Sequence, residues 1–336
     1  MLLLFRERLI QRPRPKALQI QRHILVANRL ERLAHPNVHA ILKKPRQILG
    51  GHLNAGDGLI VGRKAVAEEV MQGTLGIVCK FRLQPVHSLV DQSLCATEAK
   101  SATNGDGFGI GWYNDREFPG IFKDVRPAWN DSNLKALAAQ IESPMFLAHI
   151  RATSGSPVQR TNSHPFNHDK WLFVHNGAIN EFDKLHRDLA FAVAPGLFHE
   201  ITGSTDSELM FMLALTFGME GDVRTGLARM AGFVERTAAE HGIENALQMT
   251  LGIADGKSLY AVRYSTEGKS RSLFHSVSRD ATMDIAPNAS RFSRGARAIV
   301  SEPLTDLAEE WVAVPEASFV TITGSEITCE PFEPIA

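Results

Sequence analysis

The order of its apolar segments is the feature that most constrains the fold of this chain. Two strand-like runs at 145–152 and 170–179 precede two helical segments, one beginning near Thr205 and one over 222–241. Strand candidates then return: a pair within 246–265 around an Asp255-Gly256 turn, followed by 272–277, 296–301 and 318–323. Strands, a pair of helices and strands again favour stacked sheets with helices outside.

The two helical segments carry their own signals. Thr205 is placed to cap the first helix, with Glu208 three residues on as the partner of a capping box. That helix is apolar on most sides, so we expect it to be buried. The second helix has one apolar face, made by Val223, Leu227, Met230 and Val234.

The first 82 residues differ from the rest in charge and pattern. They hold 15 Lys and Arg against 5 Asp and Glu, whereas the other 254 residues hold 21 against 32. Short helices are expected near 17–34 and 64–72, without a steady apolar period. We interpret 1–82 as an atypical, loosely ordered basic segment ahead of a domain at 83–336. A nucleic-acid-binding arm is the alternative, which the lack of interleaved aromatic residues disfavours.

Composition limits the cellular compartment, the membrane contacts and the metal sites that we expect. No stretch is long and apolar enough to cross a bilayer, and the N-terminus lacks the cleavage site of a signal peptide. The three cysteines, Cys79, Cys95 and Cys329, form no metal-binding pattern. We therefore expect no metal, no cofactor and no membrane contact, and a reducing, cytoplasmic setting.

Four polar groups end or interrupt apolar elements: Arg151 in "HIRATSG", His164 in "SHPF", the tripeptide 175–177 in "WLFVHNGAI", and Asp206 in "STDSE". Each has a purely structural explanation. Arg151 fits a surface charge at a strand end, both histidines fit a hydrogen-bonded core, and Asn-Gly is a strong turn signal. Asp206 fits a favourable interaction with the helix dipole.

Together, the four groups match the binding of a free amino acid that carries an amide. Arg151 offers a fork for the α-carboxylate, and Asp206 offers a counter-charge for the α-ammonium. Asn176 and Gly177 offer a side-chain and a backbone N–H to one oxygen, which is an oxyanion hole for acyl transfer. A glycine there lets a substrate approach the backbone closely.

These residues lie in segments that resemble the class II glutamine amidotransferases in order: "PVHSLVDQSL", "TNGDGFGIGWY", "RPAWND", "FLAHIRATSGSPVQRTNSHPF", "WLFVHNGAI", "GSTDSELMF", "SRSLF" and "VSEPL". The resemblance is strongest to the stand-alone branch related to the amidohydrolase of ergothioneine biosynthesis, and covers residue 84 onward. It implies an α+β fold, the four-layer α/β/β/α sandwich of the N-terminal-nucleophile hydrolases.

The resemblance also implies roles for individual residues. Arg151 and Asp206 would bind glutamine, and Asn176 and Gly177 would form the oxyanion hole. His164 falls in a matched segment and is a further substrate-binding candidate. The adjacent pair Asp106 and Gly107 resembles the family's loop near the active site.

The chain departs from the family at the nucleophile. The family uses a cysteine exposed as the first residue, because its free α-amine, with a pKa near 8, serves as base for the thiol. This chain begins Met-Leu-Leu, and no cysteine lies near Lys64 or Ala65, where the family's spacing from His87 would place it. Cys79 is the nearest candidate, although it lies only eight residues before His87 and would need cleavage after Val78.

Three hypotheses follow from that departure. The basic segment replaces a lost first strand of an active enzyme, through a misread start or a frameshift. Alternatively, the chain is a catalytically dead protein that binds glutamine or a γ-glutamyl compound. In the third, residues 1–82 form a nucleic-acid-binding module on an amidotransferase-like body, whose binding would weaken steeply with salt.

The expected reaction of the family is thiol attack on a γ-glutamyl amide, followed by release of ammonia or an amine and hydrolysis of the thioester. We expect little or no turnover by this chain. The expected partners are glutamine or a γ-glutamyl small molecule, with a possible partner protein that accepts ammonia. Hydrolysis and transfer both remain open.

Overall fold

The computed structural model describes residues 73–82, 105–152, 155–277, 296–303 and 308–336. The chain divides into two units, Met1–Gly58 and Leu59–Ala336, and all described residues belong to the second. The helices expected near 17–34 and 64–72, and Cys95, lie outside the described residues. The strand at 73–82 is described by its backbone.

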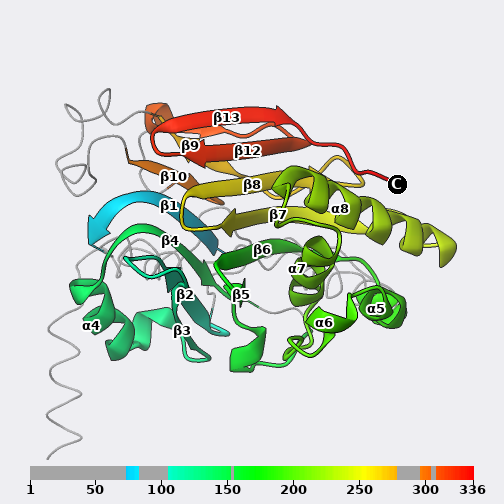
Figure 1. The fold of residues 1–336 in the computed structure, drawn as a ribbon, viewed down its shortest axis with the longest axis horizontal. Coiled ribbons are helices and arrows are strands. Elements are labelled where there is room, and N and C mark those ends of the chain that lie inside the picture. Colours follow the sequence, from blue (N-terminus) through cyan, green and yellow to red (C-terminus); the bar gives the residue numbers. More distant parts are fainter. Residues whose placement is uncertain (1–72, 83–104, 153–154, 278–295, 304–307) are drawn as a thin grey trace, which may run out of the picture. The chain divides into compact units, whose positions relative to one another are not determined.

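A seven-stranded antiparallel sheet has the strand order β11-β9-β10-β1-β4-β2-β3 (Figure 1). Neighbours in this sheet come from distant parts of the chain, since β1 lies between β4 and β10. In chain order the strands are β1 (Gly73–Arg82), β2 (Phe108–Trp112), β3 (Gly120–Asp124), β4 (Glu142–Ile150), β9 (Phe274–Ser276), β10 (Arg297–Val300) and β11 (Trp311–Ala313).

A six-stranded antiparallel sheet has the order β13-β12-β8-β7-β6-β5. Apart from the step from β8 to β12, its neighbours follow one another along the chain. The strands are β5 (Phe166–His168), β6 (Trp171–Ile179), β7 (Leu247–Ala254), β8 (Ser258–Ser265), β12 (Ser318–Thr323) and β13 (Glu326–Pro331).

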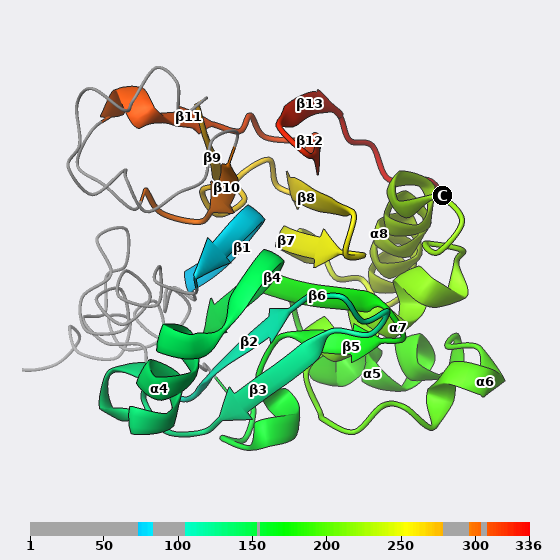
Figure 2. The ribbon, with the colours of Figure 1, turned by 60° about the vertical axis from the view of Figure 1, so that its left-hand side comes forward.

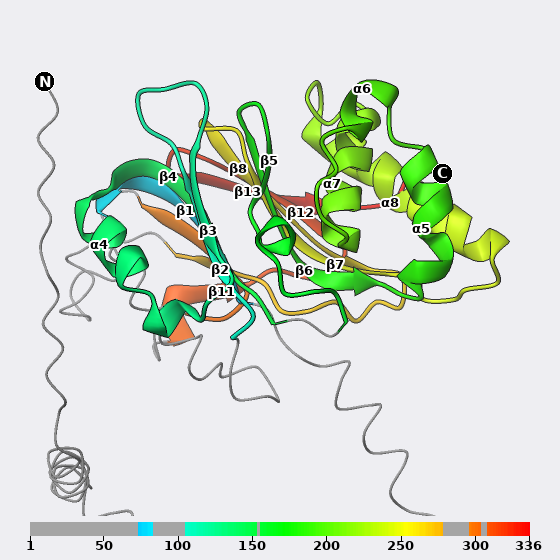
Figure 3. The same cartoon turned by 90° about the horizontal axis from the view of Figure 1, so that it is seen from below.

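The helices cover the outer faces of the two sheets, as Figures 2 and 3 show from two sides. Among the described helices, α4 (Ser132–Gln140) lies against the seven-stranded sheet, and the other four lie against the six-stranded sheet. Those four are α5 (Phe182–Phe191), α6 (Pro195–Phe198), α7 (Asp206–Thr216) and α8 (Val223–Glu240). Short 3-10 segments occur at Ala128–Asn130, Arg160–Asn162 and Ala308–Glu310.

Three apolar clusters fill the spaces between these layers. One lies between α4 and the seven-stranded sheet, and a larger one lies between the six-stranded sheet and its helices. The third joins the two sheets face to face through residues such as Leu147 of β4 and Val174 of β6. The arrangement confirms the four-layer α/β/β/α sandwich that the resemblance implied.

Most elements expected from the apolar pattern are present. The buried helix is α7, the amphipathic helix is α8 with its expected face buried, and the strand pair around Asp255-Gly256 is the β7–β8 hairpin. The pattern missed the helices α4, α5 and α6 and the strands β1, β2, β3, β5, β11 and β13. Among the described residues, no helix combines the length and the hydropathy that crossing a bilayer requires.

Candidate functional site

Asp206 is the first residue of α7, and the helix start fixes its position. Thr205 caps the helix by accepting a hydrogen bond from the backbone N–H of Glu208 at 3.2 Å. The Asp206 carboxylate accepts from the backbone N–H of Ile179 at 2.8 Å and from that of Ser207 at 2.7 Å. The first of these bonds ties Asp206 to the end of β6, two residues beyond Gly177.

Glu208 does not complete the capping box that the sequence suggested. Its carboxylate accepts from the backbone N–H and the hydroxyl of Thr202, at 3.0 and 3.2 Å, and from the backbone N–H of Gly203 at 2.7 Å. The Glu208 carboxylate therefore holds the loop before the helix, instead of accepting from the backbone N–H of Thr205.

Asn176 and Gly177 lie within β6, which continues through them to Ile179 instead of ending there. They pair with Thr250 and Met249 of β7, and Asn176 is fully buried. A Cβ atom on Gly177 would lie 2.0 Å from the carbonyl oxygen of Gln248. The close approach of β7 thus requires a glycine here, whether or not a substrate also approaches.

Arg151 directly follows β4, and the loop before β2 holds it on both sides. Its backbone N–H donates to the carbonyl of Gly107 at 2.9 Å, and its carbonyl accepts from Asp106 N–H at 3.1 Å. Its guanidinium donates to the Asp106 carbonyl, to Ser156 Oγ at 2.6 Å and to the Pro157 carbonyl at 3.2 Å. Burial lowers the pKa of Arg151, and the Asp106 charge opposes this.

The pair Asp106 and Gly107 therefore lies beside Arg151. Gly107 has a φ of +115°, and a Cβ atom there would lie 2.7 Å from the carbonyl oxygen of Asp124. Only glycine fits this conformation and this space without strain.

Asn162 is a fully buried residue that the sequence reasoning did not single out. Its amide donates to the Pro157 carbonyl at 3.0 Å, and its oxygen accepts from the backbone N–H of Ser204 at 2.9 Å. Pro157 also holds Arg151, and Ser204 lies two residues before Asp206. Asn162 thus joins the loop that holds Arg151 to the loop that leads into Asp206. Its place in the matched segment "TNSHPF" was the available signal.

Three buried histidines, His149, His164 and His175, lie in the interior near these groups. The ring centroids of His149 and His164 are 4.1 Å apart, and the ring of Phe166 follows at 4.6 Å from His164. Burial lowers the pKa of His149 to about 3 and that of His164 well below its ordinary value. These two rings are therefore neutral at pH 7.

The hydrogen bonds of His175 fix its tautomer. Its Nε2 lies 3.2 Å from the carbonyl of Gln248, which can only accept, so Nε2 carries the proton and donates. Its Nδ1 lies 2.9 Å from Ser207 Oγ, whose hydroxyl also donates to Asp206 Oδ1 at 3.1 Å. Burial is the main cause of a lowered pKa for His175, and the Asp206 charge opposes it.

These electrostatic effects connect the separate segments. The charge of Arg151 lowers the pKa of both His149 and His164, His175 lowers that of both, and Asp206 raises that of His175. His175 and Asp206 also both contact Ser207, and Asn176 and Gly177 follow His175 on β6.

Cys79 lies at the other end of β1 from Arg151. Gly73 pairs with Ile150, the residue before Arg151, whereas Val78 pairs with Met145, and the register shifts before Phe81. Six residues of strand separate Gly73 from Cys79, which is roughly 20 Å at about 3.3 Å per residue. The backbone register thus speaks against Cys79 as the nucleophile. Cys329, on β13, is exposed.

Among the described residues, one group could hold a metal ion. Ligand atoms of His168, Asp169 and Glu220 all lie within 4.8 Å of one another. His168 and Asp169 lie at the turn between β5 and β6, and Asp169 and Glu220 are exposed. None of the residues discussed above for amide chemistry belongs to this group.

Comparisons with known proteins agree with this arrangement. Residues 71–333 match the family model of class II glutamine amidotransferases. The chain is 30% identical to "Probable glutamine amidotransferase DUG3" of Saccharomyces cerevisiae, over 74% of this chain and 78% of that protein. It is 32% identical to the γ-glutamyl-hercynylcysteine sulfoxide hydrolase of Mycolicibacterium smegmatis, over 29% of this chain and 44% of that protein.

Among solved structures, a class-II domain protein of Silicibacter pomeroyi described as a glutamine aminotransferase is similar, with a TM-score of 0.60 and 28% identity. The similarity covers 78% of this chain and all of that protein. The residues matched by the family model include Arg151, Asn176, Gly177 and Asp206, and the matched fold is the sandwich described above. The chain belongs to the class II glutamine amidotransferases.

Proposed function

We propose that this domain binds the γ-glutamyl amide of glutamine or of a related compound. Arg151 takes the α-carboxylate, Asp206 takes the α-ammonium, and Asn176 with Gly177 faces the amide oxygen. The observation that carries this proposal is the hydrogen bond from Ile179 N–H to Asp206. It fixes an acidic group two residues beyond the proposed oxyanion hole, as an amino-acid headgroup on a γ-amide requires.

In the proposed reaction, a thiolate attacks the γ-carbonyl carbon and the carbonyl oxygen becomes an oxyanion. The N–H groups of Asn176 and Gly177 stabilise that oxyanion. Collapse of the tetrahedral intermediate breaks the C–N bond. The leaving amine takes the proton that the thiol had given to the free α-amine of the N-terminal cysteine. Water then hydrolyses the thioester and releases glutamate, or an acceptor amine takes the glutamyl group.

The thiol is the missing part of this scheme. Gly73 of β1 pairs with Ile150, the residue before Arg151, and Cys79 lies six residues further along that strand. We therefore propose that this chain binds the γ-glutamyl group with little or no turnover. The same binding site for the amino-acid headgroup is expected under two of the hypotheses. In one the chain is a catalytically dead binding protein, and in the other the native enzyme is active and begins β1 with a different sequence.

Calorimetry with glutamine tests the binding proposal. Arg151→Lys keeps the charge but loses the fork, and Asp206→Asn removes the counter-charge, so each should weaken binding by about 10- to 100-fold. Arg187→Lys, on the exposed face of α5, is the matched control and should bind as the parent does. Equal affinity in all four proteins would refute the headgroup assignment.

Ammonia release and mass spectrometry test the turnover proposal separately. After incubation with glutamine, the intact protein should carry no glutamyl adduct of about 129 Da, the mass that thioester formation adds. An adduct that is lost on Cys79→Ser would show instead that Cys79 is the nucleophile.

A further inference from the structure

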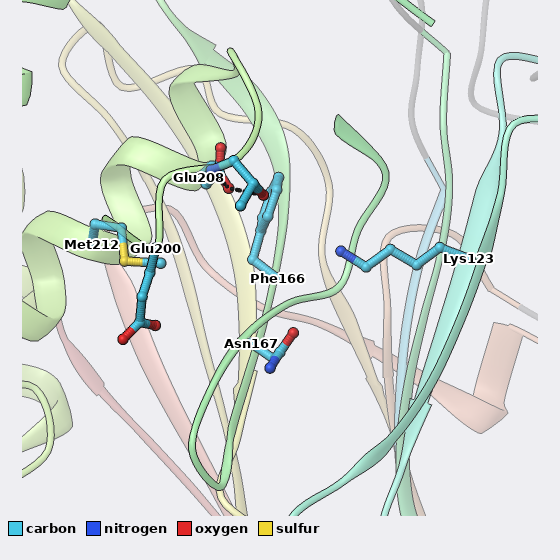
Figure 4. Close-up of a pocket in the computed structure, with 7 residues that line it drawn as sticks. Lys123, Phe166, Asn167, Glu200, Glu208 and Met212 are labelled. Atoms are coloured by element: carbon cyan, nitrogen blue, oxygen red, sulfur yellow. Dashed lines mark hydrogen bonds between the residues drawn. The ribbon is translucent and has the colours of Figure 1, made fainter. Parts of the chain in front are cut away.

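Figure 4 shows residues that line a cavity of about 270 Å³. It opens between β3 and β5 and is bounded on its other side by α7 and the loop before it. Its lining residues are Lys123, Phe166, Asn167, Glu200, Thr202, Glu208 and Met212. Because drug-sized ligands occupy cavities of about 300–1,000 Å³, this one suits a smaller molecule.

Lys123 brings a charge into this cavity. Its side chain extends from β3 toward Phe166, and its Nζ lies 5.2 Å from the centre of that ring. Among the described residues, no carboxylate forms an ion pair with this ammonium. Burial lowers the pKa of Lys123 to about 8, and the charge of Glu208 opposes this lowering only in part. At pH 7 the ammonium is therefore charged and poorly compensated.

The two carboxylates of the lining are already engaged elsewhere. Glu208 accepts three hydrogen bonds from Thr202 and Gly203, and Glu200 lies 2.8 Å from His168 Nδ1. In Figure 4 the carboxylate of Glu200 points away from Lys123. The described part of the chain thus leaves the Lys123 ammonium available for an anion that comes from outside.

We propose that this cavity is a second binding site, for a small monocarboxylate whose anion pairs with Lys123 and whose hydrocarbon part contacts Phe166 and Met212. Glu200 and Glu208 in the same lining repel any anion, and they repel a dianion such as phosphate more strongly than a monocarboxylate, so phosphate is disfavoured. A single lysine, without an arginine fork, suits one carboxylate as a point charge.

The site is separate from the proposed γ-glutamyl site. None of Arg151, Asn176, Gly177 and Asp206 lines the cavity, and His164 contacts it only from behind the lining residue Phe166, with ring centroids 4.6 Å apart. The proposal therefore holds or fails independently of glutamine binding, and its test needs no enzymatic activity.

The test is a titration of the full chain with propionate at pH 7, followed by calorimetry and by the NMR signal of the labelled Met212 methyl group. We expect a dissociation constant on the order of 1 mM, as for one ion pair with a short apolar contact. n-Propylammonium, with the same carbon chain and the opposite charge, should not bind, and phosphate should bind more weakly than propionate.

Variants assign the binding to the cavity. Lys123→Met should abolish propionate binding and Lys123→Arg should retain it, which separates loss of charge from misfolding. Lys135→Met removes an exposed lysine of α4 and should have no effect. Affinity should fall by about tenfold or more between pH 7 and pH 10, as the Lys123 ammonium loses its proton.

Several outcomes would overturn the proposal. One is the absence of binding up to about 50 mM propionate, a concentration far above the expected dissociation constant. Another is equal propionate binding by Lys123→Met, and a third is tighter binding of phosphate or n-propylammonium than of propionate. A propionate signal that leaves the Met212 methyl unchanged would also overturn it, because the ligand would then lie elsewhere.

Discussion

At the scale of the residue, Gly177 lies where β6 and β7 approach too closely for a side chain. A Cβ atom would meet the Gln248 carbonyl at 2.0 Å and His175 Nε2 at 2.7 Å. The sequence predicted the glycine as part of an oxyanion hole but could not show that strand packing requires it too. That requirement depends on β7, whose paired residue Met249 lies far along the chain.

Gly177→Ala should therefore destabilise the fold as well as any site. We expect the free energy of unfolding to fall by about 1–3 kcal/mol, the usual effect of overpacking, because backbone atoms must move apart. Urea denaturation measures this. Gly196→Ala, in α6, where no atom lies within 4 Å of the added Cβ, is the control and should change stability little. An unchanged Gly177→Ala protein would contradict the strand geometry.

Lys123 makes a separate prediction about pH. Its pKa in the folded protein is about 8, against 10.5 ordinarily, so between these values the unfolded chain binds a proton that the folded chain does not. Stability then rises with pH over this window, by up to about 3 kcal/mol from this group. Below pH 8 both states are protonated and the contribution is constant.

Denaturant unfolding at pH 7.5 and pH 10 checks this, with Lys123→Met as the comparison that cancels all other titrating groups. The parent should gain stability relative to the variant as the pH rises. Parallel pH profiles would show that the Lys123 ammonium is not desolvated in the folded protein.

At the scale of the element, strongly periodic segments were predictable and short or glycine-rich ones were not. Helix α8 has a complete apolar face and an Asp222 cap, and both ends fall close to the expected bounds. Helix α4 buries only Leu134 and Ala138, so its apolar pattern is weak, although Asp131 caps it with a 2.7 Å bond. Strand β2 contains two glycines and is defined by its pairing with β3 and β4.

A variant of Asn162 tests the connection between the loop that holds Arg151 and the loop that leads into α7. Asn162→Ala removes the hydrogen bonds of a fully buried amide to Pro157 and Ser204, and we expect it to cost about 1–3 kcal/mol of stability. Because these loops hold Arg151 and lead into Asp206, glutamine affinity should also fall. Asn130→Ala, at an exposed position, is the control. A destabilised variant with unchanged glutamine affinity would show that the link does not position the headgroup residues.

At the scale of the whole molecule, the sequence could not supply the neighbours of β1. Composition placed the start of the domain near residue 83, whereas β1 at 73–82 lies in the middle of the seven-stranded sheet and the family match begins at 71. Long-range pairing with β4 and β10 defines this strand, and local pattern does not. We propose that the amidotransferase domain begins near residue 71.

That boundary leads to a prediction about the nucleophile. A site-specific protease can be used to expose a new N-terminus at residue 73, in a Gly73→Cys variant, or at the native Cys79. The register with Ile150 favours the first, because only that end of β1 adjoins Arg151. The free α-amine of the introduced cysteine can accept the thiol proton, whereas the uncleaved protein offers an amide nitrogen that cannot. Glutaminase activity should therefore appear when the Gly73→Cys variant is cleaved before residue 73, and stay absent without cleavage. Activity only of the protein cleaved before Cys79 would mean that the active enzyme does not have the register in which Gly73 pairs with Ile150.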